Sequence, residues 1–327
     1  MKWGIIGAGT IANKFAATVS AMRAEGESLT AVASRSEANA QAFAAIYGIP
    51  RAYGSYAAMM ADPEVEAVYV ATPNAFHYEH TRLALKSGKH VLCEKPFTLN
   101  AGLARQLYAL AREKNLFVME AFWIRFLPVL TEMRKAIAAG EIGSVLHVRS
   151  DYGFIPTEVK KEIKRSYSLG VGALMDIGIY NLGFAHMVMD AAPEKISSTM
   201  RKNQYGTDDF SALLLEYPGG RSATLLTALG IDMPRYAAVF GTEGEITLDD
   251  FQMAQRMTIR RYDDTTREVD IPFDVNGFEY EIREVTRCVK LGLSTSDVLR
   301  EQDTLAVLGT MDSIRASWGM KFPGEDR

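Results

Sequence analysis

The chain has 327 residues, of which 48% are hydrophobic and 23% charged, so it is too apolar to be disordered as a whole and long enough for two packed domains. Its 36 basic and 40 acidic residues give a net charge of -4, which excludes a general attraction to nucleic acid or to an anionic membrane. Two cysteines, Cys93 and Cys288, are too few for a disulfide framework or a cysteine-rich metal site. No signal peptide or membrane-spanning run is evident, and we expect a soluble, cytoplasmic protein.

The first 120 residues alternate short β-rich segments with helical patterns, which is typical of a parallel sheet built from βαβ units. The helical face between the first two strands carries Ile11, Phe15, Val19 and Met22. Asn100 is placed to cap a helix that runs to about Lys114. The expected strands cover residues 3–6, 29–33, 67–71, 90–93 and 116–119. The pattern predicts an open, doubly wound α/β sheet.

The pattern changes after Phe122. Helices are expected over residues 128–139, 173–189, 279–291 and 301–318, and a long strand over 145–154. Further strand segments follow residue 190 and are joined by turn signals such as Pro218-Gly219-Gly220. This half is predicted to be an α+β domain with a large, mostly antiparallel open sheet. We place the boundary so that residues 1–121 form a cofactor-binding domain and residues 122–327 a substrate-binding and dimerisation domain.

A glycine motif follows the first strand and opens the first helix, in the order Gly7-Ala8-Gly9-Thr10-Ile11-Ala12. Gly7 permits the tight turn, and Gly9 lets the backbone approach a pyrophosphate at the positive end of the helix. Ala12 replaces the third glycine of the usual pattern. In this context the motif predicts a Rossmann fold that binds a dinucleotide.

The end of the second strand reads Ala33-Ser34-Arg35-Ser36, with no carboxylate before Glu37. A carboxylate there would bind the ribose 2′-hydroxyl of NAD, whereas the hydroxyls and the Arg35 guanidinium suit a 2′-phosphate. NADP is therefore favoured as the cofactor, with NAD as the alternative. A second interpretation leaves Arg35 as a surface residue that stacks on the adenine.

Two further segments follow strands and are expected at the same carboxyl edge of the sheet, where open α/β sheets bind ligands. Thr72-Pro73-Asn74 follows residues 67–71, and Cys93-Glu94-Lys95-Pro96 ends the next strand. Pro96 biases Lys95 away from helix, so its side chain can point into the crevice.

Together, the glycine motif, Thr72-Pro73-Asn74 with His77, and Glu94-Lys95-Pro96 resemble the glucose-fructose oxidoreductase, inositol dehydrogenase and MocA family. The resemblance covers almost the whole chain. A finer likeness to the branch of dimeric dihydrodiol dehydrogenases and NADP-dependent D-xylose dehydrogenases rests on three segments, namely residues 119–126, residues 172–180 and Asp208-Asp209.

The resemblance implies a two-domain oxidoreductase that transfers a hydride between nicotinamide C4 and a small sugar, polyol or cyclic diol. Lys95 is then the active-site lysine. Many relatives have histidine where this chain has Tyr180, so Tyr180 is the expected acid-base. A nearby ammonium would favour the phenolate. Asp176 lies one turn before Tyr180 and is expected to bind the substrate or Lys95. The alternative for Asp176 and Tyr180 is a packing helix with a polar tip.

Other residues are expected around the two sites. The resemblance places Trp123 in the substrate pocket and Arg125 near the cofactor, while Phe154 is a further candidate wall of the substrate pocket, together with Tyr152 and Phe278. His77 and His80 share a helical face, but no third ligand is evident, so no metal is expected. The expected cofactor ligands are Gly7, Gly9, Thr10, Ile11, Ser34, Arg35, Thr72, Pro73, Asn74, His77, Glu94, Lys95 and Arg125.

Two other functions stay open. Some members of the family use NAD transiently to cleave a glycoside or epimerise a sugar without net redox change, and a sugar-regulated repressor shares the fold. The presence of Lys95, Asp176 and Tyr180 favours an enzyme with net redox chemistry. The expected partner is a small-molecule substrate, with no nucleic acid or membrane, and the resemblance implies a homodimer formed through the C-terminal sheet.

Overall fold

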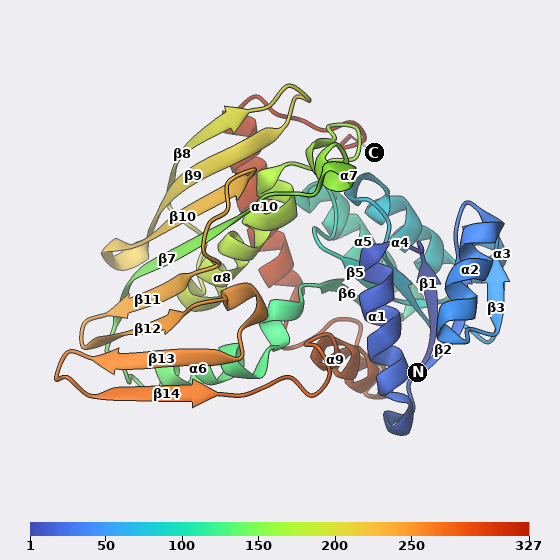
Figure 1. Cartoon of the computed structure of the whole chain (residues 1–327), viewed down its shortest axis with the longest axis horizontal. Coiled ribbons are helices and arrows are strands. Elements are labelled where there is room, and N and C mark those ends of the chain that lie inside the picture. The colour runs from blue at the N-terminus through green and yellow to red at the C-terminus, as the bar shows by residue number, and fades with distance from the viewer. Residues whose placement is uncertain (327) are drawn as a thin grey trace. The chain divides into compact units, whose positions relative to one another are not determined.

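The computed structural model describes residues 1–326, which form two compact units (Figure 1). The first unit contains residues 1–123 and 274–304, and the second contains residues 124–273 and 305–326. The segment 274–304, which follows the second sheet in sequence, thus groups with the N-terminal residues. The assignment of a cofactor domain and a substrate domain stays a prediction.

The first unit is built on a parallel sheet of six strands in the order β3-β2-β1-β4-β5-β6. The strand order runs outward from β1 in both directions, to β3 on one side and to β6 on the other. This is the doubly wound arrangement predicted from the sequence. Every residue of β4 is buried, as expected for a strand covered on both faces. The strands are β1 Lys2–Ile6, β2 Ser28–Ala33, β3 Arg51–Tyr53, β4 Ala67–Val70, β5 His90–Glu94 and β6 Val118–Ala121.

Helices connect these strands. The apolar face predicted for α1 packs into the core, since Phe15 and Val19 are fully buried. The Phe15 ring stacks on that of Tyr69, with centroids 3.8 Å apart. Asn100 caps α5 as predicted, because its side chain accepts a hydrogen bond from the Leu103 N–H at 2.8 Å. The helices are α1 Thr10–Ala21, α2 Glu37–Tyr47, α3 Tyr56–Met60, α4 His77–Lys86, α5 Ala101–Lys114 and α9 Glu279–Lys290.

The second unit is built on a sheet of eight strands in the order β14-β13-β12-β11-β7-β10-β9-β8. The pairing of β7 with β10 is parallel and the other neighbours are antiparallel, which confirms the predicted mostly antiparallel sheet. The strands are β7 Val145–Phe154, β8 Lys195–Lys202, β9 Asp208–Tyr217, β10 Arg221–Leu229, β11 Ala237–Gly241, β12 Gly244–Leu248, β13 Arg256–Arg261 and β14 Thr266–Asp270.

The predicted helix over residues 173–189 has two parts, a π-helical segment Leu174–Gly178 and α8 Ile179–Met189. It packs against β7 and β10, where the Asn181 amide donates hydrogen bonds to the Leu226 carbonyl and to Thr227 Oγ1, both at 2.9 Å. A π-helical turn often marks a functional site. The other helices of this half are α6 Pro128–Ala138, α7 Glu158–Lys161 and α10 Glu301–Ser317.

Among residues 1–326, no helix combines the length and the hydropathy that a membrane span requires.

Candidate active site

A pocket of about 280 Å³ opens at the carboxyl ends of β1, β2 and β4 in the first unit. It therefore lies at the edge where the sequence predicted a dinucleotide. The pocket contains the predicted residues Gly7, Gly9, Ser34, Arg35, Thr72 and Pro73, and in addition Ala8, Asn39, Tyr56, Ala71, Phe76 and His80.

The two glycines of the motif have different surroundings, a close backbone contact at Gly7 and open space at Gly9. Gly7 has φ +96°, and a Cβ at this position would lie 2.7 Å from the Ala71 carbonyl oxygen, so a larger residue is excluded. A Cβ at Gly9 would meet no atom within 4 Å, so the space beside this residue is open. Gly9 also precedes α1 without a side-chain cap, which leaves the N–H groups of the first turn, including those of Thr10 and Ile11, available to an anion. The site fits the diphosphate of a dinucleotide.

Arg35 gives the pocket a positive charge next to the N-terminus of α2. Its side chain is exposed and lines the pocket beside Ser34. Ser36 is occupied as the cap of α2, where its hydroxyl accepts a hydrogen bond from the Asn39 N–H at 3.3 Å. A guanidinium beside a helix N-terminus is a suitable environment for a phosphate.

The sequence interpretation missed an aromatic wall of this pocket. The His80 ring lies against Tyr56 and Phe76, with ring centroids 4.6 Å and 5.8 Å apart. Burial, helped by the charges of His77 and Arg35, lowers the pKa of His80 to about 4, so the ring is neutral at physiological pH. The rings of this wall offer flat surfaces on which a nucleotide base can stack. Phe76 and His80 lie four residues apart at the start of α4, and only the structure brings Tyr56 of α3 against them.

His77 is a link between two loops. It is buried, and its ring nitrogens lie 2.7 Å from the carbonyl oxygens of Thr72 and Pro96. It is not among the residues that line the pocket. Burial lowers its pKa. His77 thus ties the loop after β4 to the loop that carries Lys95.

A buried carboxyl also accepts a hydrogen bond from the loop that carries Lys95. Glu120 of β6 accepts hydrogen bonds from the Phe97 N–H and the Thr304 hydroxyl, each at 2.9 Å. Burial raises the pKa of Glu120 to about 7, against the effect of these hydrogen bonds and of the charge on Lys95. On the other side, Tyr69 donates a hydrogen bond to Glu94. The Glu94-Lys95-Pro96 turn is therefore held by side chains on β4 and β6.

Trp123 packs within the first unit. Its ring lies 5.2 Å from that of Phe278, and the Lys14 ammonium sits 4.2 Å and 4.5 Å from the two centroids. Nearby, Glu281 is fully buried, and neither of its carboxylate oxygens has a hydrogen-bond partner among the described residues. Burial raises its pKa well above the usual value, and the Glu94 charge adds to this effect. Lys14 and Glu281 were not expected from the sequence.

In the second unit, Asp176 and Tyr180 are both buried on the helix that begins with the π-helical segment. Lys164 donates a hydrogen bond to Asp176 Oδ1 at 2.7 Å. The sequence interpretation did not find Lys164, which lies in the 3₁₀ segment Ile163–Arg165 after α7. A contact between Asp176 and Lys95 stays a prediction.

One aromatic ring, that of Tyr152, lies against Tyr180. The Tyr152 ring lies 6.1 Å from Tyr180 and 6.3 Å from Phe154, so these rings form one cluster. The Arg235 guanidinium lies over Tyr152 at 5.6 Å. Arg125, in the 3₁₀ segment Trp123–Phe126, is half-buried. Its place beside the cofactor stays a prediction.

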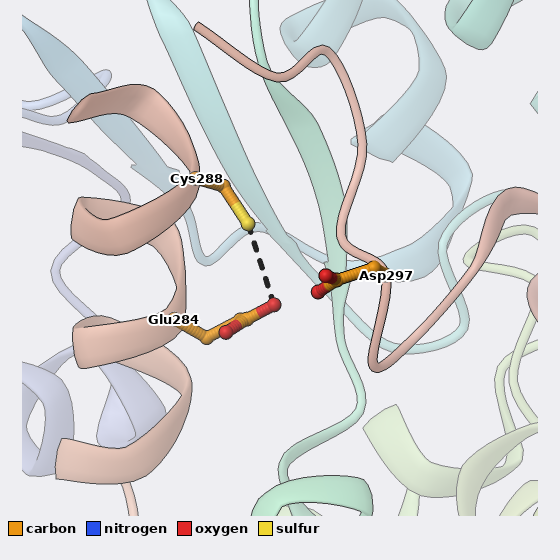
Figure 2. A group of neighbouring side chains, drawn as sticks. All are labelled: Glu284, Cys288 and Asp297. Atoms are coloured by element: carbon orange, nitrogen blue, oxygen red, sulfur yellow. Dashed lines mark hydrogen bonds between the residues drawn. The ribbon is translucent and has the colours of Figure 1, made fainter. Parts of the chain in front are cut away.

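Figure 2 shows Glu284 and Cys288 of α9 with Asp297, a group whose spacing would suit a metal ion. Arg287 already meets these acceptors, because its guanidinium pairs with Glu284 at 2.8 Å and with Asp297. The Cys288 thiol donates to Glu284 at 3.3 Å, and burial raises its pKa to about 12. One arginine thus already pairs with both carboxylates of the cluster, and we assign no metal to it.

Comparison with known proteins agrees with this geometry. The family model described as the oxidoreductase family with an NAD-binding Rossmann fold, GFO/IDH/MocA, matches residues 1–122, and the model of the GFO/IDH/MocA C-terminal domain matches residues 130–247. The trans-1,2-dihydrobenzene-1,2-diol dehydrogenase of Xenopus laevis is 34% identical over 98% of this chain and 99% of its own. The chain belongs to the GFO/IDH/MocA oxidoreductase family. The family predicted from the motifs is confirmed.

Further members of the family were compared by sequence and by structure. The human trans-1,2-dihydrobenzene-1,2-diol dehydrogenase is 32% identical over all of this chain and 99% of its own. A 3-ketoreductase from Actinomadura kijaniata, solved with NADP and TDP-benzene, matches with a TM-score of 0.86 and 26% identity over 97% of both chains. An aldose-aldose oxidoreductase from Caulobacter crescentus, complexed with glycerol, matches with a TM-score of 0.87 and 25% identity over 98% of both chains.

Proposed function

We propose that this family member is an NADP-dependent dehydrogenase or reductase that acts on a CH–OH carbon of a small sugar, polyol or cyclic diol. The assignment of NADP as the cofactor rests on one pocket, which is lined by Arg35 and by the glycine turn with the open space beside Gly9. The substrate class is supported by the relatives, which are named as a trans-dihydrodiol dehydrogenase, an aldose-aldose oxidoreductase and a 3-ketoreductase.

In the proposed mechanism, bound NADP supplies the acceptor for a hydride from the carbinol carbon. Tyr180 takes the proton of the reacting hydroxyl, so the alcohol loses one hydride and one proton and becomes a carbonyl. Lys95 stabilises the negative charge that develops on this oxygen and favours the phenolate. Asp176, held by Lys164, orients the hydroxyl. In the reverse direction Tyr180 returns the proton to the carbonyl oxygen.

A screen of absorbance at 340 nm tests this proposal. NADP and NAD are each offered with D-xylose, D-glucose, other aldoses, inositols and trans-dihydrodiols. The proposal expects reduction of NADP by at least one of these alcohols. Tightly retained NAD together with conversion of a sugar and no net reduction would instead establish the redox-neutral alternative, and binding of NADP without turnover on any substrate would favour a regulator.

We also propose that the chain forms a homodimer through the open face of the second sheet. Leu214 of β9 is a large apolar side chain that is 41% exposed on this sheet, in register with Thr224 of β10. Light scattering during size exclusion measures the mass directly. A monomer at micromolar concentration would contradict the proposal.

A further inference from the structure

A buried carboxyl lies at the start of the helix that carries Asp176 and Tyr180. Asp208, the first residue of β9, is fully buried, and its Oδ2 accepts a hydrogen bond from the Leu174 N–H at 2.7 Å. Its Oδ1 has no partner among the described residues. Burial raises the pKa of Asp208 to about 7. No role for this residue follows from the mechanism proposed above.

The first turn of this helix needs an acceptor from elsewhere in the chain. The N–H groups of a first helical turn have no partner within the helix, and Ala173, which precedes the π-helical segment, provides no side-chain cap. Asp208 supplies this acceptor from a strand 34 residues further along the chain. A carboxyl at a helix N-terminus is also favoured by the helix dipole.

The neighbours of Asp208 hold the segment that precedes the helix. The Thr207 hydroxyl donates to the Arg165 carbonyl at 3.0 Å, and the Arg165 Nε donates to Asp209 Oδ1 at 2.6 Å. Lys164, which pairs with Asp176, is the residue before Arg165. Residues 207–209 therefore contact both the start of the helix and the segment that carries the partner of Asp176.

Gly172 makes room for this arrangement. A Cβ at Gly172 would lie 2.4 Å from Asp208 Oδ1, so a larger residue would displace the carboxyl from the helix. The close approach of backbone and carboxyl provides a second way to disturb the contact without changing Asp208.

We infer that Asp208 is a positioning residue that fixes the first turn of the helix and thereby the orientation of Asp176 and Tyr180. The inference rests on the proposed function only for its effect on turnover. The hydrogen bond to Leu174 requires an acceptor oxygen, which asparagine retains and alanine lacks.

The test compares Asp208→Ala with Asp208→Asn in the full chain, by amide hydrogen exchange and by kinetics. Asp208→Ala is expected to speed exchange of the amides of residues 174–178 about tenfold and to lower kcat by up to about 100-fold. The KM for NADP should stay within about twofold of wild type. Asp208→Asn should restore both exchange and kcat to within a few-fold.

Ser211→Ala is the matched control, because Ser211 is buried on the same strand and its hydroxyl has no partner among the described residues. It should leave exchange and kcat unchanged. If Asp208→Ala does not fold, Gly172→Ala should reproduce its effects. Unchanged exchange at residues 174–178 in these variants, or an equal loss in Asp208→Asn and Asp208→Ala, would overturn the inference. Binding of NADP without turnover on any substrate in the 340 nm screen would overturn the proposed function, while the exchange data would still decide the role of Asp208.

Discussion

The two units present their candidate site residues in different ways. In the first unit, the residues lie on loops at the ends of parallel strands, and a pocket already joins Gly7, Gly9 and Arg35. In the second, Asp176 and Tyr180 lie on one helix, and a carboxyl from a distant strand accepts from its first turn. The cofactor site thus depends on local turns, whereas the proposed catalytic helix depends on contacts between segments far apart in the sequence.

In both units, a buried carboxyl with a raised pKa accepts a hydrogen bond from the backbone close to the proposed site residues. Glu120 binds the backbone N–H of Phe97, two residues after Lys95, and Asp208 binds that of Leu174, two residues before Asp176. Burial raises both pKa values to about 7. In each unit, a buried carboxyl whose pKa lies close to physiological pH therefore accepts a hydrogen bond from the backbone beside a proposed site residue.

A large loss of turnover is expected from Lys95→Met. Loss of the ammonium removes the charge that stabilises the reacting oxygen, and kcat should fall by about 100-fold to 1000-fold. Binding of NADP, measured by fluorescence titration, should change much less. A kcat near that of wild type would show that the first unit contributes the cofactor alone and not a catalytic group.

A smaller effect, confined to the cofactor, is expected from Arg35→Ala. Removal of a charged hydrogen-bond donor to a phosphate should weaken NADP binding by about 10-fold to 100-fold. NAD lacks the 2′-phosphate, so its Kd should change little. Titration calorimetry with both cofactors measures the difference, and an equal loss for both would remove Arg35 from phosphate recognition.

The effect expected from Glu120→Gln concerns stability and not turnover or cofactor binding. Because the pKa of Glu120 is raised in the folded state, its stabilising contribution is complete below about pH 4.5 and is lost as the pH rises through 7. A pKa that rises from 4.5 to about 7 corresponds to about 3 kcal/mol. Glutamine resembles the protonated form, so the stability of this variant should fall less between pH 5 and pH 8.

Urea unfolding of Glu120→Gln and wild type at several pH values measures this difference. Glu113→Gln is the control, because Glu113 is exposed on α5. Asp208 and Glu281, whose pKa values are also raised, titrate in both proteins and cancel in the comparison. Parallel stability profiles would mean that Glu120 is not protonated at neutral pH.

Much of the fold could be predicted from the sequence because its signals are local. The strand over residues 145–154 and the helix from Asn100 to Lys114 agree with the structure. The last strand of the first sheet was expected over residues 116–119 but occupies Val118–Ala121, because Asn115 at φ 53° and the Leu116 N–H complete the end of α5. β3 was missed because three half-buried residues carry no apolar pattern.

The glycine turn could be predicted from the sequence, because the spacing of Gly7 and Gly9 between a strand and a helix itself indicates the backbone geometry. Tyr56 meets Phe76 and His80 only through tertiary packing, and so does Lys164 with Asp176. His77 was expected to bind the cofactor, whereas its ring nitrogens lie against two carbonyl oxygens. Such contacts depend on tertiary structure, which residue spacing alone does not encode.

The central claim is that Tyr180 carries the proton during hydride transfer. The most direct test is the rate of NADP reduction by Tyr180→Phe with the substrate found at 340 nm, measured over pH 6–10. The account predicts that kcat falls by about 100-fold to 10,000-fold while the Kd for NADP stays within about twofold of wild type. A kcat and pH profile equal to those of wild type would contradict it.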